Sequence, residues 1–444
     1  MYSLEQQIAF NKYISGKNIF ITGPGGSGKS KLIRDIKADA LKRDKKIQVC
    51  ALTGCAAVLL DCRAKTIHSW SGIGLGNGSQ QALIEKIKKN HFKRHCWKSL
   101  DILVIDEVSM MSKKIFNLLD AIGKAIRHSS KPFGGIQLIF SGDFYQLPPV
   151  GQKEEPETIQ FCFESENWFK TFEKENNIQL KTIFRQKDPI YADIFNQIRE
   201  GKLKKSSCEL LNKYINREKP NDFSPTKLFP TRYKADYVNQ EEMLKLEEEE
   251  ECICNLQVQT NLPMSEKDKL ERNNLTKEQI ETELNYIQGN LLCEASIKFK
   301  KGAQVMCIVN IELPNGFILC NGSQGKIVGI KDNIPIVRFN FNNNQVVEMP
   351  MVPHIWPSEN IPGIGVSQVP LILAWALTIH KSQGATLDCA EIDVGNSIFE
   401  CGQTYVALSR IKNLEGLYLT SFEPTRIRIN KNVRDFYDNL NMSA

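Results

Sequence analysis

The sequence predicts an α/β protein of about three domains, in which helices cover parallel sheets and one small antiparallel barrel is inserted. The chain has 444 residues, and a domain averages roughly 150 residues. In the first half, short strands that are apolar on both faces alternate with helical stretches, as is typical of parallel sheets. Between Gln304 and Met351, closely spaced strands with turn residues indicate the barrel.

The first α/β region starts with a strand at Ile19–Ile21, a glycine-rich loop and a helical pattern of apolar residues from Leu32 to Ile36. Three later segments have the same short, apolar character and are predicted as strands: Ile47–Leu52, Asp101–Ile105 and Ile136–Phe140. Helical stretches such as Ile115–Ile126 separate them. This alternation predicts a parallel sheet with helices on both faces.

The second half of the sequence is less regular. Two apolar segments, Ile178–Ile183 and Leu371–Leu377, suggest a second set of α/β elements. Between them lie a run of glutamates at Glu247–Glu251 and a polar helical stretch at Thr276–Tyr286. The predicted barrel strands are Gln304–Val309, Lys326–Ile330, Pro335–Phe341 and Val346–Met351. We therefore expect the barrel to interrupt the second α/β region.

Charge is distributed unevenly along the chain. The formal net charge is +6, from 57 Lys and Arg against 51 Asp and Glu. Residues 1–150 hold 23 basic and 11 acidic residues, whereas residues 241–283 hold 5 basic and 13 acidic residues. Outside the acidic stretch the chain is basic, which suits a polyanionic partner, although solubility alone explains it equally well. We interpret the acidic stretch as a solvated surface helix, with a DNA-mimicking regulator as the alternative.

The cysteine pattern and the hydropathy of the sequence bear on the cellular compartment of the protein and on membrane contact. The 13 cysteines are odd in number and contain no Cys-x-x-Cys pair, so we expect a reduced, intracellular protein. His91, His95 and Cys96 form a tight group, but the neighbouring lysines and the lack of a second ligand pair favour a basic helix over a zinc site. No apolar run of ~18 residues and no secretory or transit peptide is recognisable. We expect no membrane contact.

The glycine-rich loop carries a phosphate-binding motif. It matches G-x-x-x-x-G-K-[ST] and consists of Gly23, Pro24, Gly25, Gly26, Ser27, Gly28, Lys29 and Ser30. Because glycine has no Cβ, the backbone N–H groups can turn inward around phosphate oxygens at the N-terminus of a helix. Lys29 can reach the β- and γ-phosphates, and the Ser30 hydroxyl can join the Mg²⁺ shell. The loop lies between a predicted strand and a predicted helix, as the motif requires.

Two adjacent carboxylates support the same interpretation. Asp106 and Glu107 end the apolar strand Ile102–Ile105. Ligands bind at the carboxyl ends of parallel strands, so an acidic pair there fits a nucleotide site. Asp106 can hold Mg²⁺, and Glu107 can polarise the attacking water. The two motifs together predict an ATPase or GTPase, but they do not tell what hydrolysis drives.

Further motifs carry a family resemblance. Gly142–Val150 contains Gly-Asp-x-x-Gln-Leu-Pro-Pro and resembles motif III of superfamily 1 helicases. Leu4–Gln6 resembles their Q motif. Thr53–Ala57 and Thr66–Gly74 look like motif Ia and its extension. The order of these segments along the chain is that of the superfamily.

The resemblance narrows in the second half of the chain. Leu180–Asp188 and Ile198–Gly201 are similar to the signature of the petite-integration-frequency family of 5′→3′ DNA helicases, RecD-like members of superfamily 1B. Trp375–Leu387 and Tyr405–Arg410 resemble motifs V and VI. The resemblance therefore covers the chain from about Leu4 to Thr420.

This resemblance implies two RecA-like domains with ATP between them, and an SH3-like barrel inserted into the second. Domain 1A would comprise residues 1–178, with a small 1B insertion at about 69–95. Domain 2A would comprise residues 179–250 and 358–430, and residues 251–357 would form the 2B region with the barrel. Residues 431–444 would be a C-terminal tail.

The resemblance also implies roles for single residues. Gln6 resembles the residue that reads the adenine edge. Gln146 lies where the family couples the state of the γ-phosphate to the grip on DNA. Arg185 and Arg410 would approach from the second domain as arginine fingers. Gly384, in motif V, would contact the nucleotide.

Four residues lie in motifs that contact single-stranded DNA in the family, namely Thr53, His68, Thr378 and His380. Their hydroxyl and imidazole groups can bond phosphate oxygens. Trp70 lies two residues after His68 and could either stack on a base or pack in the core.

The resemblance implies an ATP- and Mg²⁺-dependent 5′→3′ DNA helicase that serves replication, repair or recombination. Single-stranded DNA and DNA forks are the expected partners, and we expect a monomeric core helicase. The polarity rests on the resemblance alone. Three alternatives stay open: a translocase that displaces proteins without unwinding, an RNA helicase of the same superfamily, and a non-catalytic nucleic-acid-binding subunit.

Overall fold

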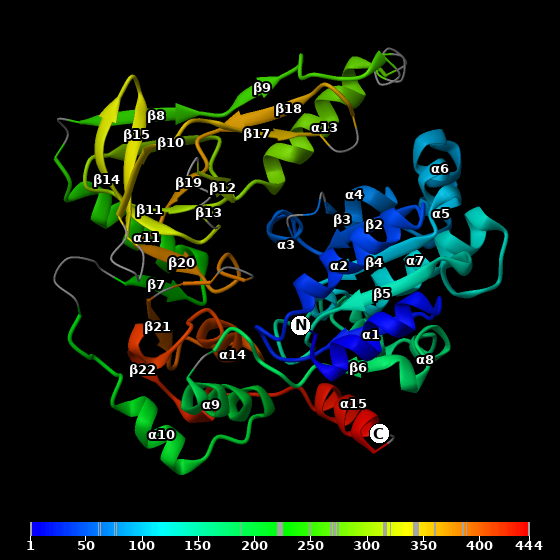
Figure 1. The fold of residues 1–444 in the computed structure, drawn as a ribbon, viewed down its shortest axis with the longest axis horizontal. Helices are drawn as coiled ribbons and strands as arrows, with labels where there is room; N and C mark the ends of the chain where they lie inside the picture. The colour runs from blue at the N-terminus through cyan, green and yellow to red at the C-terminus, as the bar shows by residue number, and fades with distance from the viewer. Residues whose placement is uncertain are drawn as a thin grey trace. The chain divides into compact units, whose positions relative to one another are not determined.

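The computed structural model describes residues 2–60, 62, 64–74, 76, 78–186, 188–219, 225–247, 250–266, 269, 272, 275–313, 318–319, 321–340, 346–358, 361–383, 386–387 and 389–442. The chain forms two compact units (Figure 1). The first comprises Met1–Leu211, Ile398–Ser409 and Glu423–Ala444, and the second comprises Asn212–Ser397 and Arg410–Phe422. Within these described ranges, no helix is long and apolar enough to cross a membrane.

Among the described residues, the first unit contains a six-stranded parallel sheet of order β3-β2-β4-β5-β1-β6. Its strands are β1 Ile19–Thr22, β2 Ile47–Ala51, β3 Lys65–Thr66, β4 Ile102–Asp106, β5 Gln137–Ser141 and β6 Asn177–Gln179. All the strands run in one direction, so their carboxyl ends meet at one edge of the sheet. At that edge the phosphate-binding loop follows β1, Asp106 ends β4, and Glu107 comes directly after it.

Helices cover both faces of this sheet, because successive strand residues point to opposite sides. Ile21 and Val104 belong to one core, under α1 Leu4–Ile14, α2 Lys29–Lys42 and α3 Gly54–Leu59. Phe20 and Ile105 belong to the other, which is rich in aromatic side chains. Its helices are α4 Ile67–Ser71, α5 Gln80–Lys89, α6 His91–Ser99, α7 Lys113–Arg127, α8 Trp168–Thr171 and α15 Lys431–Asn441. The predicted two-sided α/β sheet is confirmed.

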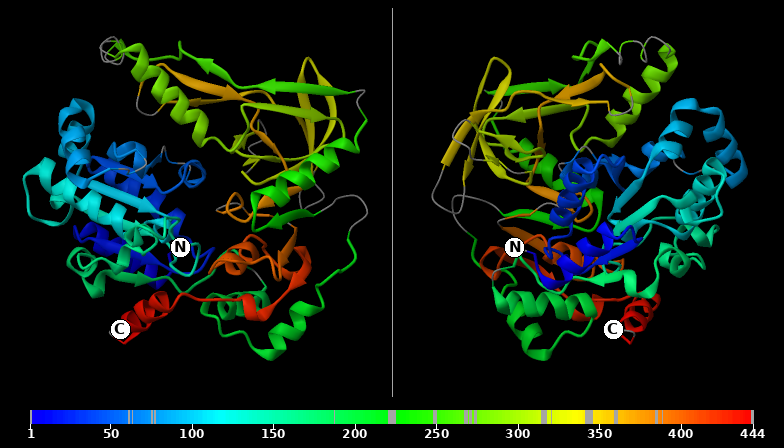
Figure 2. Two further views of the ribbon diagram at one scale, coloured as in Figure 1. Left: turned by 180° about the vertical axis from the view of Figure 1, so that it is seen from behind. Right: turned by 45° about the vertical axis from the view of Figure 1, so that its right-hand side comes forward.

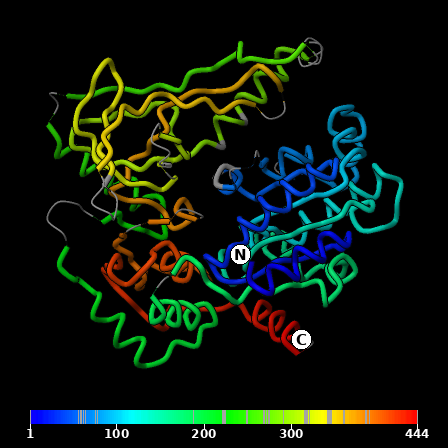
Figure 3. Tube along the Cα trace, viewed as in Figure 1, coloured from blue at the N-terminus to red at the C-terminus, as the bar shows by residue number. Residues whose placement is uncertain are grey.

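The C-terminal end of the chain belongs to the first unit. Helix α15 lies beside α8 in the ribbon and in the tube (Figures 1 and 3), and the rings of Trp168 and Phe436 are 6.2 Å apart. Two further helices of this unit, α9 Pro189–Glu200 and α14 Gln403–Leu408, pack together through the rings of Phe195 and Tyr405. The segment expected as a tail is thus largely a packed helix.

The described part of the second unit contains a four-stranded parallel sheet of order β20-β7-β21-β22. Its strands are β7 Thr226–Phe229, β20 Ala376–Thr378, β21 Ala390–Val394 and β22 Leu417–Phe422. Helix α11, Arg232–Leu244, follows β7, and its Asn239 side chain bonds the Ala376 backbone of β20. The second parallel sheet implied by the resemblance is therefore present.

Antiparallel strands make up most of the remainder of this unit. Those described form one sheet of order β16-β15-β14-β11-β19, one of order β17-β18-β9, and the pairs β10-β8 and β12-β13. The bounds are β8 Glu251–Asn255, β9 Gln257–Gln259, β10 Ser296–Lys300, β11 Gln304–Cys307, β12 Ile311–Glu312, β13 Ile318–Leu319, β14 Gln324–Lys331, β15 Ile334–Asn340, β16 Val346–Pro350, β17 His354–Pro357, β18 Gly365–Gln368 and β19 Leu371–Leu373. Helix α13, Lys277–Asn290, packs on β18 through a small apolar cluster that includes Leu284 and Val366. Figure 2 shows the ribbon of this helix beside that strand.

The predicted barrel strands are confirmed as antiparallel strands β11, β14, β15 and β16. Their closure into an SH3-like barrel stays a prediction. One other prediction was wrong. Ile178–Ile183 does not begin a second set of α/β elements, because β6 pairs with β1 in the first sheet. Leu371–Leu377, predicted to belong to the second set of α/β elements, does so only in part: β20 pairs with β7 in the second parallel sheet, whereas β19 pairs with β11 in the antiparallel sheet.

Candidate functional site

The phosphate-binding loop has the backbone that its glycines predict. Gly26 and Gly28 have φ values of 82° and 84°, a region that side chains disfavour. A Cβ at Gly23 would come within 2.5 Å of the Leu180 carbonyl oxygen. The Phe184 N–H donates to the Gly26 carbonyl at 2.8 Å, which holds the segment after β6 against the loop. Both glycine conformation and close backbone approach therefore shape this loop.

The groups in the loop fit a polyphosphate. Among the described residues, no side chain caps the N-terminus of α2, whose first N–H groups lack intrahelical partners. The Ser27 hydroxyl is buried and has no hydrogen-bond partner in this part of the chain. Lys29 Nζ lies 2.7 Å from the Gly23 carbonyl and 3.0 Å from the Pro24 carbonyl. Donors thus converge where an anion would bind.

Burial and the neighbouring carboxylates have opposite effects on the charge of Lys29. Burial lowers the pKa of the Lys29 ammonium, and the carboxylates of Asp143, Glu107 and Asp106 oppose that shift. Burial raises the pKa of the Asp106 carboxyl. Glu107 has a φ of 55°, an unusual backbone conformation for a residue with a side chain. Such conformations cluster at active sites, so the acidic pair has the features of a functional site.

The Q-motif glutamine is held by its own helix. Ser3 and Gln6 form a capping box at the start of α1, in which the Ser3 N–H donates to Gln6 Oε1 at 3.0 Å. Gln6 Nε2 donates to the Ser27 carbonyl at 3.2 Å. The amide is therefore buried beside the phosphate-binding loop. Its predicted role in reading adenine stays a prediction.

Asp143, in motif III, is the centre of a buried charged network. Arg199 donates to both carboxylate oxygens, from Nε at 2.8 Å and from Nη2 at 2.9 Å. The Tyr405 hydroxyl donates to Asp143 Oδ2 at 2.9 Å and accepts the Gly25 N–H at 3.0 Å. Burial alone would raise the pKa of the Asp143 carboxyl, but Arg199 holds it below its usual value. The Gln146 N–H donates to the Asp143 carbonyl, so this turn positions Gln146.

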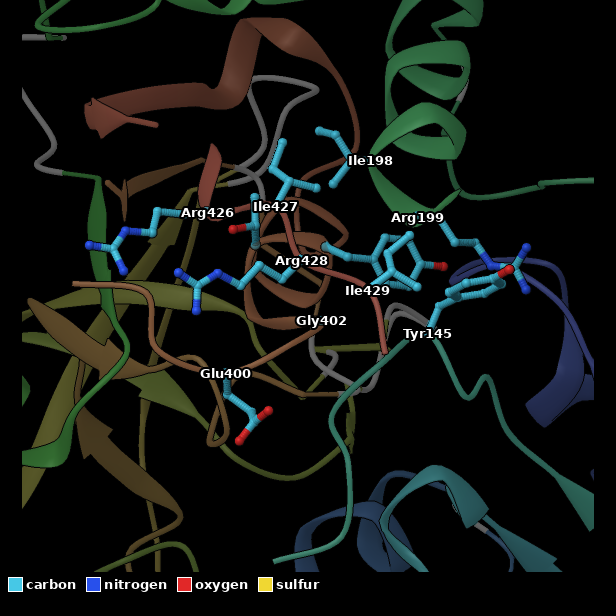
Figure 4. A pocket seen from close by; sticks show the side chains of 11 residues that line it. Tyr145, Ile198, Arg199, Glu400, Gly402, Arg426, Ile427, Arg428 and Ile429 are labelled. Atoms are coloured by element: carbon cyan, nitrogen blue, oxygen red, sulfur yellow. The ribbon is translucent and has the colours of Figure 1, made fainter. Parts of the chain in front are cut away.

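Arg199 is also fixed by aromatic rings. Its guanidinium carbon lies 4.6 Å from the ring centre of Tyr145 and 5.4 Å from that of Tyr437. Figure 4 shows Arg199 beside Tyr145 in a small pocket, with Arg426 and Arg428 extending to the other side. Sequence reasoning missed the functional candidates Asp143, Arg199 and Tyr405. All three residues stand in segments that resemble helicase motifs, and those motifs were the available signal.

The two predicted arginine fingers lie in different units. Arg185, which we predicted to come from the second domain, lies instead in the first unit, because Phe184 ties its segment to the loop. Its Nη1 donates to the Ser409 carbonyl at 3.2 Å, and burial lowers its pKa. Arg410 lies in the second unit, buried, with Nη1 3.2 Å from the Ser382 carbonyl. Gly384 lies outside the described residues.

The two predicted DNA-binding residues of the first unit, Thr53 and His68, contact different groups. Thr53 Oγ1 accepts the Ala56 N–H at 3.1 Å and so caps α3. His68 lines a groove of about 340 Å³ with Lys114 and Gln152. Burial lowers the pKa of the His68 imidazole, which favours its neutral form. Trp70 packs in the core, with its ring 4.8 Å from that of Trp97, so it is not a base-stacking residue.

The second unit has a groove of its own. It has a volume of about 500 Å³ and contains Arg232, Lys298, Thr378 and Lys381 in its lining. Thr378 Oγ1 accepts the Lys381 N–H at 3.0 Å, which turns the chain directly after β20. His380 lies in this turn, half-buried. Asp236 and Glu294 also line this groove, and Asp236 pairs with Arg232 at 3.1 Å, so side chains of both charges surround the Thr378 hydroxyl.

Comparison with known proteins identifies the family. A family model described as PIF1-like helicase matches residues 2–209, and one described as DNA helicase Pif1, 2B domain, matches residues 283–330. The ATP-dependent DNA helicase PIF1 of Emericella nidulans is 34% identical over 96% of this chain and 61% of that protein. The ATP-dependent DNA helicase RRM3 of Saccharomyces cerevisiae is 32% identical over 99% of this chain and 67% of that protein. The chain belongs to the PIF1-like helicase family.

Solved Pif1 structures share the fold. The crystal structure of Pif1 helicase from Candida albicans has a TM-score of 0.77 at 34% identity, over 99% of each chain. Bacteroides sp Pif1 in complex with ADP-AlF4 has a TM-score of 0.77 at 27% identity, over 100% of this chain and 98% of that one. Bacteroides Pif1 bound to ssDNA has a TM-score of 0.63 at 26% identity, over the same shares. The PIF1-like chain described here spans less than two thirds of the Emericella protein.

Proposed function

We propose that this chain is an ATP-dependent DNA helicase that moves 5′→3′ along single-stranded DNA and separates the duplex ahead of it. One observation carries the proposal. A glycine loop at an uncapped helix N-terminus lies in one compact unit with the Asp106–Glu107 pair, in a chain of the PIF1-like helicase family. The names of the relatives, and the ADP-AlF4 and ssDNA in the Bacteroides structures, support the same activity.

We assign the chemistry of hydrolysis to the first unit. Lys29 would exchange the carbonyls of Gly23 and Pro24 for the β- and γ-phosphates of ATP. Glu107 would orient and deprotonate the attacking water. Ser30 and Asp106 would hold Mg²⁺, which neutralises phosphate charge when bound. A hydroxyl and a carboxylate are oxygen ligands of the kind that Mg²⁺ prefers.

The arginines and Gln146 would link hydrolysis to movement. A guanidinium neutralises the charge that spreads over the transferring phosphoryl group. We assign this role to Arg185 and Arg410, and Gln146 would respond to the γ-phosphate through the Asp143 turn. Arg185 belongs to the first unit and Arg410 to the second.

DNA would bind each unit through polar groups at its groove. We assign this role to His68 and Thr378, which line the two grooves, and also to Thr53 of the first unit and His380 of the second. Contacts of this kind to the backbone carry affinity without sequence preference. Separation of each base pair requires on average ~1.4 kcal/mol, which ATP hydrolysis supplies in excess. Replication, repair or recombination would be the processes served.

Nucleic-acid-stimulated ATP hydrolysis tests the proposal. We expect single-stranded DNA to stimulate turnover more than RNA of the same sequence does. The Lys29→Ala variant is expected to lose turnover, because the phosphate site loses its cation. Stronger stimulation by RNA would favour an RNA helicase, which must recognise the 2′-OH. Normal turnover by Lys29→Ala would refute the nucleotide site.

A further inference from the structure

The last helix of the chain is built into the core of the first unit. Val433, Phe436, Tyr437 and Leu440 are its buried residues, and their spacing puts them on one face. The Phe436 ring stacks on that of Phe163 at 4.4 Å. An apolar anchor needs only hydrophobic side chains. Tyr437 is different, because it carries a hydroxyl into this core.

The Tyr437 hydroxyl reaches the start of the phosphate-binding loop and motif III at once. Its oxygen lies 2.6 Å from Thr22 Oγ1, on the residue that ends β1 directly before Gly23. It accepts the Phe144 N–H at 3.2 Å. It donates to Asp143 Oδ1 at 3.4 Å. One hydroxyl thus joins β1 to the Asp143 turn.

The donors and acceptors of this group balance. A tyrosine hydroxyl donates one hydrogen bond and accepts up to two. Asp143 is an ionised acceptor, so Tyr437 must donate to it, and the Thr22 hydroxyl must donate to Tyr437. With the Phe144 N–H, the hydroxyl is then fully used. Burial, and after it the nearby Asp143 charge, raises the pKa of Tyr437, so the hydroxyl keeps its proton.

A second tyrosine hydroxyl, that of Tyr405, connects Asp143 to the phosphate-binding loop itself. Tyr405 donates to the other carboxylate oxygen of Asp143 and accepts the N–H of Gly25. The loop is therefore fixed to Asp143 from two sides, through Thr22 and Tyr437 before it and through Gly25 and Tyr405 within it. Gln146, three residues after Asp143, follows the same turn.

We propose that helix α15 is part of the nucleotide machinery, with Tyr437 as a positioning residue that sets the Asp143–Gln146 turn against the phosphate-binding loop. The proposal rests on the ATP hydrolysis proposed above. It gives the C-terminal helix a role beyond packing: the hydroxyl keeps the γ-phosphate-sensing turn and the phosphate loop in register while ATP is hydrolysed.

The Tyr437→Phe variant tests this role, because it keeps the ring and removes only the hydroxyl. We expect kcat for DNA-stimulated hydrolysis to fall about tenfold, the scale of one misplaced hydrogen bond, with little change in KM for ATP. Tyr13→Phe is the matched control. Tyr13 is a buried tyrosine of the same unit that donates to Asp39 at 2.8 Å, away from the loop. We expect it to lose similar thermal stability and to keep wild-type kcat.

Thr22→Val gives a second variant that leaves α15 intact. It is expected to lower kcat as Tyr437→Phe does. The double variant should be no slower than the slower single one, because Tyr437→Phe already removes the bond that Thr22→Val removes. Wild-type kcat in Tyr437→Phe, equal losses in Tyr13→Phe, or additive losses in the double variant would overturn the proposal. A wild-type chain without DNA-stimulated hydrolysis would overturn the proposed function itself, and this inference with it.

Discussion

Replacing Arg199 with alanine would leave the Asp143 carboxylate buried without its main counter-charge. The two side chains are 11% and 0% exposed, and their shortest ion-pair distance is 2.8 Å. Arg199 also supplies two of the hydrogen bonds to the carboxylate. Removal of one partner from a buried pair costs roughly 3–5 kcal/mol. Domains are typically stable by only about 5–15 kcal/mol, so Arg199→Ala is expected to destabilise the first unit severely.

The loss should depend on pH in a definite direction. In the wild type the folded-state pKa of Asp143 is below the unfolded value of about 3.9. Its stabilising contribution is therefore present above that pH and is lost only as the pH falls through the folded pKa. Without Arg199, burial raises the pKa of Asp143, so folding of the variant favours the protonated acid. The stability deficit should be largest at neutral pH and shrink as the solution is acidified.

Urea unfolding followed by tryptophan fluorescence measures this, since Trp97 and Trp168 are buried in the first unit. Arg43→Ala is the matched control, because Arg43 pairs with Asp39 at 2.8 Å but is 51% exposed. We expect the control to lose at most about 1 kcal/mol. A loss in Arg199→Ala no larger than in the control, or one that does not change with pH, would refute the reasoning.

Two further predictions concern hydrolysis. Glu107→Gln should bind ATP and hydrolyse it slowly, because the amide cannot take the proton of the attacking water; nucleotide-binding and turnover assays check this, and wild-type turnover would remove Glu107 from that role. Arg410→Ala should bind nucleotide but lose turnover, because a charge-neutralising guanidinium is gone; a variant with wild-type turnover, measured beside its circular dichroism, would argue against the finger.

The first sheet was predictable because strands such as β4 are apolar up to their last residue, and motif spacing placed the loop after β1. The second sheet was harder. Strands β7, β21 and β22 mix polar residues with apolar ones, as Lys227 and Glu391 illustrate. The division of Leu371–Leu377 between two sheets has a physical cause: β19 and β20 are separated by only two residues, and the apolar pattern runs through both. The pattern of apolar residues within a segment does not show which sheet the strand joins.

Some residues of the nucleotide site could be predicted from the sequence, and others could not. The phosphate-binding motif predicted Gly26 and Lys29, and the acidic pair after an apolar strand predicted Asp106, because the chemistry of each motif dictates its residue types and spacing. Tyr437 lies in no motif. Its hydrogen bond with Thr22 joins residues 415 positions apart, so no sequence pattern indicates it. Trp70 was left open between stacking and packing, and its contact with Trp97 decides for packing. Contacts between distant segments required the structure.

The central claim is most directly tested by strand separation on two partial duplexes that differ only in their single-stranded tail. With ATP and Mg²⁺, the chain should unwind the duplex with a 5′ tail and leave the one with a 3′ tail largely intact, and Lys29→Ala should unwind neither. Preference for the 3′ tail would contradict the assigned polarity. Hydrolysis with displacement of DNA-bound streptavidin but no strand separation would contradict the helicase assignment and favour a translocase.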